Sequence, residues 1–233
     1  MTSGNYIKIK TKDNQEFSGY LCQPPSGKGP GLLLVQEIFG VNSHIRDVAQ
    51  LYAAAGFVVL APDLFWRSEP GVQLGYTNPD FAKGLDLYNK LDMKQALSDL
   101  ADALDTLRKL PGVSDKVGAI GYCLGGNIAY RLAAAGLVDA AVAYYGGGID
   151  QALDEAKNLQ CPLLMHFADL DKYIPASAVE KIRSALAAKP NVTIHTYAGV
   201  DHGFNCDQRS AYNREASTLA LSRSAAFLHK YLN

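Results

Sequence analysis

Residues 116–126 read KVGAIGYCLGG, and this segment contains the clearest structural signal in the chain. Its first part, Lys116–Gly121, is a short apolar run of the kind that forms a buried β-strand. Glycine lies two residues before and two residues after Cys123, where a side chain would clash across a tight turn. A helical pattern follows at Gly125–Ala135. The segment therefore predicts a strand, a sharp turn with Cys123 at its apex, and a helix.

The same order of short apolar runs and longer helical patterns continues along the chain from Gly31. This order is typical of βαβ units, in which helices cover both faces of a mostly parallel sheet. We expect strands at Tyr6–Lys10, Glu16–Cys22, Gly31–Gln36, Phe57–Ala61, Lys116–Gly121, Ala140–Tyr145, Pro162–Ala168 and Val192–Tyr197. We expect helices at Ser43–Ala55, Asp92–Leu110, Gly125–Ala135, Ala176–Ala188 and Arg209–Tyr231. The first two strands are separated by only a few polar residues, which predicts a hairpin.

One long segment, Asp63–Lys90, shows weak periodicity. It is much longer than the usual connection of about 2 to 6 residues, and we expect it to pass over one end of the sheet. Ligands of open α/β sheets bind at the carboxyl ends of the strands, so chemistry is expected just after each strand. The sequence therefore predicts a single α/β domain spanning residues 1–233.

The composition excludes several classes of partner. The chain has 233 residues, with 22 Lys and Arg against 23 Asp and Glu, and a formal net charge of −1. No basic excess exists to bind nucleic acid. No apolar run approaches the roughly 20 residues that cross a membrane, and the N-terminal residues do not resemble a secretory signal. We expect a cytoplasmic monomer or small homo-oligomer, with a small-molecule substrate and no membrane partner.

Cys123 stands where the nucleophile elbow Gly-x-Ser-x-Gly carries its serine, so it is a candidate nucleophile. The N-terminus of the following helix adds positive potential, which favours a thiolate. Cysteine is also a common small buried residue, and the same glycines could mark only a close contact between strand and helix. The motif taken alone leaves both interpretations open.

Two later strand ends supply candidate partners for Cys123. The loop after the seventh expected strand contains Asp169 and Asp171, and the loop after the eighth contains His202. This is the order of an α/β-hydrolase triad, in which histidine takes the nucleophile's proton and a carboxylate orients the imidazole. Each residue alone would be a helix cap or an ordinary loop histidine. Spacing does not separate Asp169 from Asp171.

The segment Gln36–Gly40 follows another strand and adds a further element. A backbone N–H in this segment and that of Leu124 could form an oxyanion hole, worth about 3 kcal/mol per donor. If Glu37 is buried beside Cys123, the thiol of Cys123 could give its proton to Glu37 as well as to His202. If it is exposed, it is a solvated charge.

Six motifs together resemble those of the dienelactone hydrolase (carboxymethylenebutenolidase) family. They are QEIFGVN at 36–42, APDL at 61–64, GYCLGG at 121–126, YYG at 144–146, DKYIP at 171–175 and HGF at 202–204. The set spans most of the chain and is far more specific than any one motif. The resemblance implies a single α/β-hydrolase domain that hydrolyses lactones or esters without a cofactor.

The resemblance also implies roles for individual residues. By position, these are Cys123 as nucleophile, His202 as base and acid, Asp171 as orienting carboxylate, Glu37 as the group that holds the resting thiol and takes its proton when substrate binds, and Ile38 and Leu124 as backbone oxyanion donors. The choice of Asp171 over Asp169 rests on this resemblance.

Two positions depart from the family pattern. Members of the muconate pathway resemble one another in using two arginines to hold the carboxylate of dienelactone, and the matching positions here are Phe81 and Cys206. Neither side chain replaces a bidentate arginine. We therefore expect a neutral or more apolar ester or lactone as substrate. The expected pocket residues are Phe81, Tyr88, Tyr145, Phe204 and Cys206.

No metal or cofactor is expected. The remaining histidines, His44, His166, His195 and His229, show no metal-ligand spacing, and no nucleotide-binding glycine pattern occurs. Two alternative functions remain: a binding or redox-sensing domain in which Cys123 is oxidised, and an acyltransferase. A redox sensor needs neither a histidine base nor oxyanion donors, so the full set favours the hydrolase.

Overall fold

The computed structural model describes residues 4–233. Contacts within the chain gather into two compact units, the first ending at Gly118 and the second beginning at Ala119. Each unit has its own strands and covering helices.

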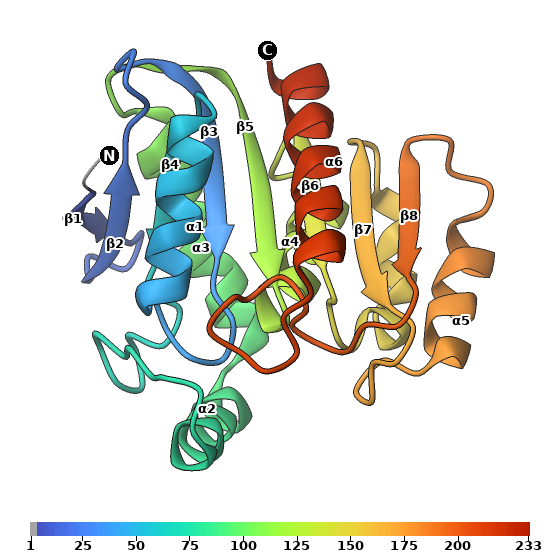
Figure 1. The fold of residues 1–233 in the computed structure, drawn as a ribbon. Coiled ribbons are helices and arrows are strands. Elements are labelled where there is room, and N and C mark those ends of the chain that lie inside the picture. The colour runs from blue at the N-terminus through green and yellow to red at the C-terminus, as the bar shows by residue number, and fades with distance from the viewer. Residues whose placement is uncertain (1–3) are drawn as a thin grey trace. The chain divides into compact units, whose positions relative to one another are not determined.

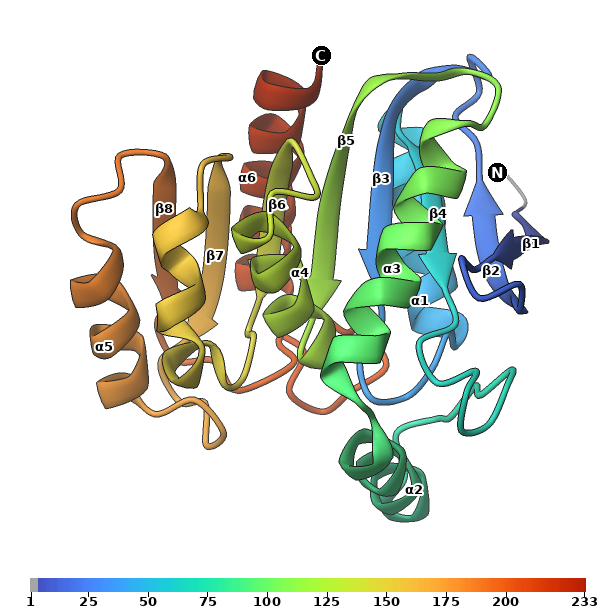
Figure 2. The same cartoon turned by 180° about the vertical axis from the view of Figure 1, so that it is seen from behind.

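The first unit is built on four strands. They are β1 (Asn5–Lys10), β2 (Glu16–Cys22), β3 (Gly29–Val35) and β4 (Val58–Pro62). β1 and β2 form the expected antiparallel hairpin, β2 pairs antiparallel with β4, and β3 pairs parallel with β4. Helices α1 (Ser43–Ala54) and α3 (Met93–Arg108) lie on opposite faces of β3 and β4 (Figures 1 and 2). Every residue of β4 is buried, as a strand covered on both faces requires.

The excursion after β4 contains a helix that the periodicity did not predict, α2 (Asn78–Lys90). Only Gly84 and Leu87 of this helix are buried, so it lacks the apolar stripe by which a packed helix is recognised. The N-terminus of α2 nevertheless carries local sequence signals. Thr77 and Asp80 form a reciprocal capping box, and a proline lies in the first turn.

The second unit contains three strands in parallel pairing. They are β6 (Ala140–Tyr144), β7 (Leu163–Ala168) and β8 (Val192–Tyr197). Helices α4 (Leu124–Ala134) and α6 (Arg214–Leu232) lie on opposite faces of β6, as Figures 1 and 2 show, and α5 (Ala176–Leu186) connects β7 to β8. Two short 3-10 helices, η1 (Ile149–Gln151) and η2 (Leu153–Asn158), were not predicted.

Strand β5 (Val113–Tyr122) contains residues of both units. Within residues 4–233, eight strands are hydrogen-bonded in the order β1-β2-β4-β3-β5-β6-β7-β8. The sheet is mixed and helices surround it, so the predicted α/β-hydrolase fold class is confirmed. No helix in this part of the chain combines the length and apolar character of a membrane span.

The predicted element ends differ from the structure by a few residues. The final helix begins at Arg214 rather than Arg209, because the side chain of Asn213 accepts a hydrogen bond from the Ala216 N–H at 3.0 Å and caps the helix there. β5 begins three residues before the predicted Lys116.

Candidate active site

Cys123 lies at the sharp turn between β5 and α4. Its φ is 55°, a left-handed conformation that costs a non-glycine residue about 1 to 3 kcal/mol. The Cys123 N–H donates to the carbonyl oxygen of Tyr144 at 3.1 Å, which holds the turn against the end of β6. A Cβ at Gly121 would lie 2.0 Å from the carbonyl oxygen of Gly125, and one at Gly126 would lie 2.4 Å from that of Tyr144. The glycines are therefore required by close backbone contacts.

Leu124 is the first residue of α4. The first backbone N–H groups of a helix have no acceptor within that helix, and they carry the positive end of its dipole. The N–H of Leu124 therefore has no acceptor within α4.

His202 connects the two other residues of the predicted triad. Its Nδ1 is 2.7 Å from Oδ2 of Asp171, and the side chain of Cys123 is near enough to raise the pKa of the imidazole. Because Nδ1 faces the carboxylate, Nε2 is the nitrogen left for the sulfur. His202 is buried and the Asp171 carboxylate is fully buried, so this hydrogen bond is shielded from water.

The structure distinguishes Asp171 from Asp169. The second oxygen of Asp171 accepts the backbone N–H groups of Tyr173 at 2.8 Å and Ile174 at 3.1 Å. Asp169 is exposed, and its carboxylate accepts from the N–H of Val200 at 3.3 Å. The aspartate that hydrogen-bonds His202 is therefore Asp171.

The electrostatics of this group favour a charged imidazole. Burial alone lowers the pKa of His202, but the negative sulfur of Cys123 and the hydrogen bond to Asp171 outweigh burial and raise the pKa to about 10. At neutral pH, His202 is therefore an imidazolium.

Two predicted pocket residues, Tyr145 and Phe204, lie beside this group. Tyr145 has a φ of 35°, and its N–H donates to the carbonyl oxygen of His166 at 2.7 Å. Its fully buried ring is 5.0 Å from the imidazole of His202 and 5.4 Å from the ring of Phe204. A strained, buried aromatic residue against the imidazole limits the positions that His202 can adopt.

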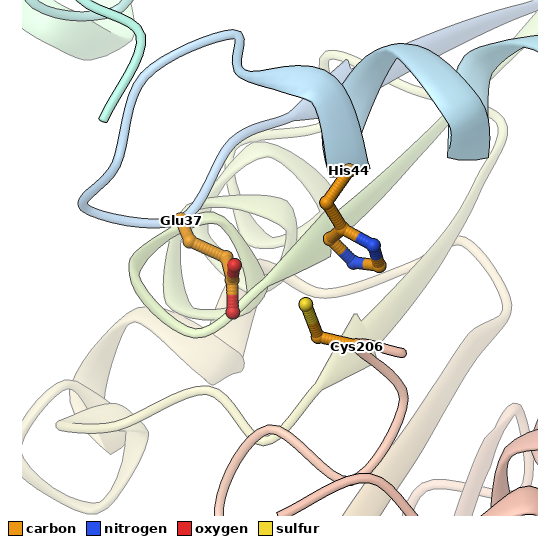
Figure 3. A group of neighbouring side chains, drawn as sticks. All are labelled: Glu37, His44 and Cys206. Carbon is orange, nitrogen blue, oxygen red and sulfur yellow. The ribbon is translucent and has the colours of Figure 1, made fainter. Parts of the chain in front are cut away.

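In the first unit, Glu37 lies just after β3. Its carboxylate is fully buried and accepts a hydrogen bond from the hydroxyl of Tyr76 at 3.0 Å. Asn42 also donates to that hydroxyl, at 3.2 Å, and caps α1. Figure 3 shows Glu37 on this loop and His44, also buried, on the first turn of α1. The interpretation of Glu37 as a solvated surface charge is therefore wrong.

The other predicted residues of the first unit belong to the loop after β3 and to α2. A Cβ at Gly84 would lie 2.6 Å from the carbonyl oxygen of Ile38, so α2 packs directly on that residue. Phe81 is half-buried and Tyr88 is 44% exposed on α2. In the second unit, Cys206, labelled in Figure 3, is fully buried.

Sequence reasoning missed two residues of these sites. Tyr76 binds Glu37 from a segment without clear periodicity, so no local signal pointed to it. Tyr173 lies within the quoted motif DKYIP, and its ring is 5.1 Å from that of His202. The position of Tyr173 two residues after Asp171 was a signal that could have been used.

Comparison with known proteins agrees with the predicted family. The model of the dienelactone hydrolase family matches residues 17–232. A proposed carboxymethylenebutenolidase of Azospirillum brasilense is 39% identical over 97% of this chain and 98% of its own length. The carboxymethylenebutenolidase of Pseudomonas putida is 33% identical over 95% of this chain and 94% of its own. The crystal structure of a proposed dienelactone hydrolase from Klebsiella pneumoniae has a TM-score of 0.85 at 29% identity, covering 98% of this chain and 100% of that one.

The family match covers nearly the whole chain, and the relatives align over almost their full lengths. The predicted resemblance is thus confirmed, and the chain belongs to the dienelactone hydrolase family as a hydrolase of lactones or carboxylic esters.

Proposed function

We propose that this enzyme cleaves a small neutral lactone or ester through an acyl intermediate on Cys123. In this proposal His202 transfers the proton, and Asp171 orients the imidazole of His202. One observation carries the proposal: a single buried imidazole is hydrogen-bonded to Asp171 through Nδ1 at 2.7 Å, and the side chain of Cys123 acts on the same imidazole and raises its pKa. This arrangement supports nucleophilic catalysis, because the carboxylate orients the imidazole and the imidazole takes the proton of the nucleophile.

In the first half of the reaction, the thiolate sulfur attacks the carbonyl carbon and the carbonyl oxygen takes the displaced electron pair. The N–H of Leu124 is the proposed donor to that oxygen, worth about 3 kcal/mol in the transition state. The intermediate then collapses, the bond to the alcohol oxygen breaks, and this oxygen takes the proton from His202. The products of this step are a thioester on Cys123 and the alcohol, which is free for an ester and stays attached to the acyl chain for a lactone.

In the second half, His202 is neutral and accepts a proton from water. The resulting hydroxide attacks the thioester carbon, and collapse breaks the carbon–sulfur bond. The acid leaves, and the thiolate and imidazolium are restored. Asp171 stabilises the imidazolium each time it forms and holds it in the correct tautomer.

The roles of Glu37 and Ile38 stay predictions from the family resemblance. Both residues belong to the first unit, whereas the triad belongs to the second. The buried carboxylate of Glu37 and its hydrogen bond from Tyr76 are compatible with a group that exchanges a proton rather than a surface charge.

The proposed preference for a neutral substrate rests on Phe81 and Cys206. An apolar ring and a fully buried thiol stand where the resemblance places arginines, and neither provides a paired donor for a carboxylate. We expect low activity on dienelactone and higher activity on neutral esters. Phe81→Arg should raise kcat/KM for dienelactone. If the ratio of kcat/KM for dienelactone to that for neutral esters stayed as in the wild type, this preference would be contradicted.

The catalytic proposal is tested by hydrolysis of p-nitrophenyl acetate. Cys123→Ala and His202→Ala should abolish turnover, and Asp171→Asn should lower kcat by about 100-fold or more. Cys161→Ala is the matched control, because burial raises the pKa of this half-buried thiol to about 11 and it should remain unreactive. Hydrolysis by Cys123→Ala at the wild-type rate would refute the proposal.

A further inference from the structure

The turn that holds Asp171 exposes two large apolar side chains. Leu170 is 58% exposed and Tyr173 is 62% exposed, the highest values among the large apolar residues of the described chain, 4–233. Single exposed apolar residues are ordinary on a protein surface. Two on one short turn that also carries a proposed catalytic carboxylate need a more specific explanation.

The exposure of Tyr173 does not come from a loose turn. Its N–H donates to the fully buried carboxylate of Asp171 at 2.8 Å, and the next residue, Ile174, is buried and donates to the same oxygen. The N–H of Leu170 donates to the carbonyl oxygen of Val200 at 3.0 Å. Both side chains thus extend from fixed backbone, and a preorganised apolar group loses little entropy when it binds a ligand.

The ring of Tyr173 lies against the imidazole of His202. The two ring centroids are 5.1 Å apart at an angle of 74°, an edge-to-face contact. His202 therefore contacts one fully buried ring, that of Tyr145, and one exposed ring, that of Tyr173. The Tyr173 ring is thus both exposed to solvent and in contact with His202.

The chemistry of the imidazole identifies which part of the substrate comes near this ring. His202 delivers its proton to the oxygen of the departing alcohol, so that oxygen must come within hydrogen-bond reach of Nε2. Groups attached to the alcohol oxygen then extend past the side chains that flank the imidazole. The acyl group instead points away from the alcohol, on the other side of the carbonyl carbon.

We propose that Tyr173 and Leu170 form an apolar subsite for the alcohol part of the substrate, which favours aromatic or other bulky apolar alcohols. This inference rests on the proposed function, since it assigns the leaving-group side by the role of His202. Tyr173 acts here as a specificity residue through its ring, and its hydroxyl is not required.

Three esters separate the alcohol side from the acyl side. 2-Phenylethyl acetate carries a phenyl group on the alcohol, ethyl 3-phenylpropanoate carries one on the acyl group, and ethyl acetate carries none. In Tyr173→Ala, kcat/KM for 2-phenylethyl acetate should fall about 3- to 10-fold, the usual worth of an aromatic pair. The values for the other two esters should stay within about twofold. Tyr173→Phe should behave as wild type because it keeps the ring.

Tyr231→Ala, which removes a tyrosine ring from the C-terminal end of α6, is the control for loss of a ring elsewhere in the same unit. An equal loss on all three esters would overturn the subsite, because Tyr173 would then only support His202. No loss on any ester would also overturn it. Failure of the proposed function would appear differently, as turnover of ethyl acetate that survives in Cys123→Ala.

Discussion

At the scale of single residues, His202 determines how the proposed reaction depends on pH. Burial disfavours its charge, yet Cys123 and Asp171 raise its pKa to about 10. His202 must be protonated to donate to the leaving alcohol, and a raised pKa means that this form is present at neutral pH and is lost only as pH rises through about 10. The acid needed for the first half-reaction is therefore available throughout the neutral range.

We predict that kcat/KM for alkyl esters falls on the alkaline side near pH 10, not near the ordinary histidine value of about 6.5. In Asp171→Asn, the pKa of His202 should fall because the variant loses a hydrogen-bonded carboxylate. Both effects can be followed by the pH–rate profile and by NMR titration of the imidazole, assigned by its absence in His202→Gln. An alkaline limb near pH 6.5 in the wild type would show that Cys123 and Asp171 do not raise the pKa of His202.

Sequence alone identified the residue types of the site but not all of their partners. Cys123 and His202 could be predicted as candidates because glycine spacing and strand ends mark their positions. Spacing could not separate Asp171 from Asp169, since two carboxylates two residues apart suit the same strand end, and only the family resemblance favoured Asp171. The fold agrees with that choice, because it buries the Asp171 carboxylate against His202 and exposes Asp169.

At the scale of elements, the turn between β5 and α4 depends on backbone contact. Gly121→Ala would place a Cβ 2.0 Å from the carbonyl oxygen of Gly125, and a backbone atom cannot move aside as a flexible side chain can. We predict that this variant loses esterase activity at least about 100-fold, because a shift of about 1 Å at a nucleophile has that effect. The matched variant is Gly147→Ala, where a Cβ would have no neighbour within 4 Å. Equal activities of the two variants would contradict this explanation of the turn.

Helix α6 is joined to the strands of the second unit by a buried polar network. Ser224 of α6 bonds the hydroxyl of Tyr144 in β6 at 2.7 Å and Nε2 of His166 in β7 at 3.0 Å. Nδ1 of His166 is 2.8 Å from the hydroxyl of Tyr197 in β8, which Arg223 also contacts. Burial lowers the pKa of His166 well below its ordinary value, and His195 and Arg223 lower it further.

The network predicts how the stability of the protein changes in mild acid. His166 stays neutral in the folded state, while in the unfolded chain it takes up a proton as pH falls below about 6.5. Its contribution to the free energy of unfolding is therefore present above that pH and is lost on acidification, by up to about 1.4 kcal/mol per pH unit. We expect the unfolding free energy of His166→Gln to fall less steeply than that of the wild type below pH 6.5.

Denaturant titrations at a series of pH values measure this difference. The neighbour His195 also has a lowered pKa, so His195→Gln serves as a comparison for a residue that is only partly buried. Parallel curves for the wild type and His166→Gln would mean that His166 is not the group that titrates.

Elements were predictable where burial imposes a pattern on the sequence. β2 and β8 have their predicted bounds, because alternation or an apolar run fixes their length. α2 was missed because it buries only Gly84 and Leu87, and the local evidence for it was its capping box and the proline in its first turn. A helix that contributes little to a core leaves little periodicity to read.

At the scale of the whole molecule, motif order carried more information than composition. Composition excluded nucleic acid as an expected partner, whereas six motifs in sequence identified the family and the fold. Three expectations stay predictions: a single domain, a cytoplasmic location, and a monomeric or small oligomeric state. Net charge and hydropathy do not decide them, because proteins of many kinds share these values.

The most direct test is the mass of the enzyme during turnover of p-nitrophenyl acetate. Rapid acid quench of the wild type should give a protein heavier by one acetyl group, and peptide mapping should place that group on Cys123 as a thioester. Cys123→Ala, which lacks the nucleophile, should accumulate no such species. Turnover without any acetyl group on Cys123, or with the group on another residue, would contradict the proposed mechanism.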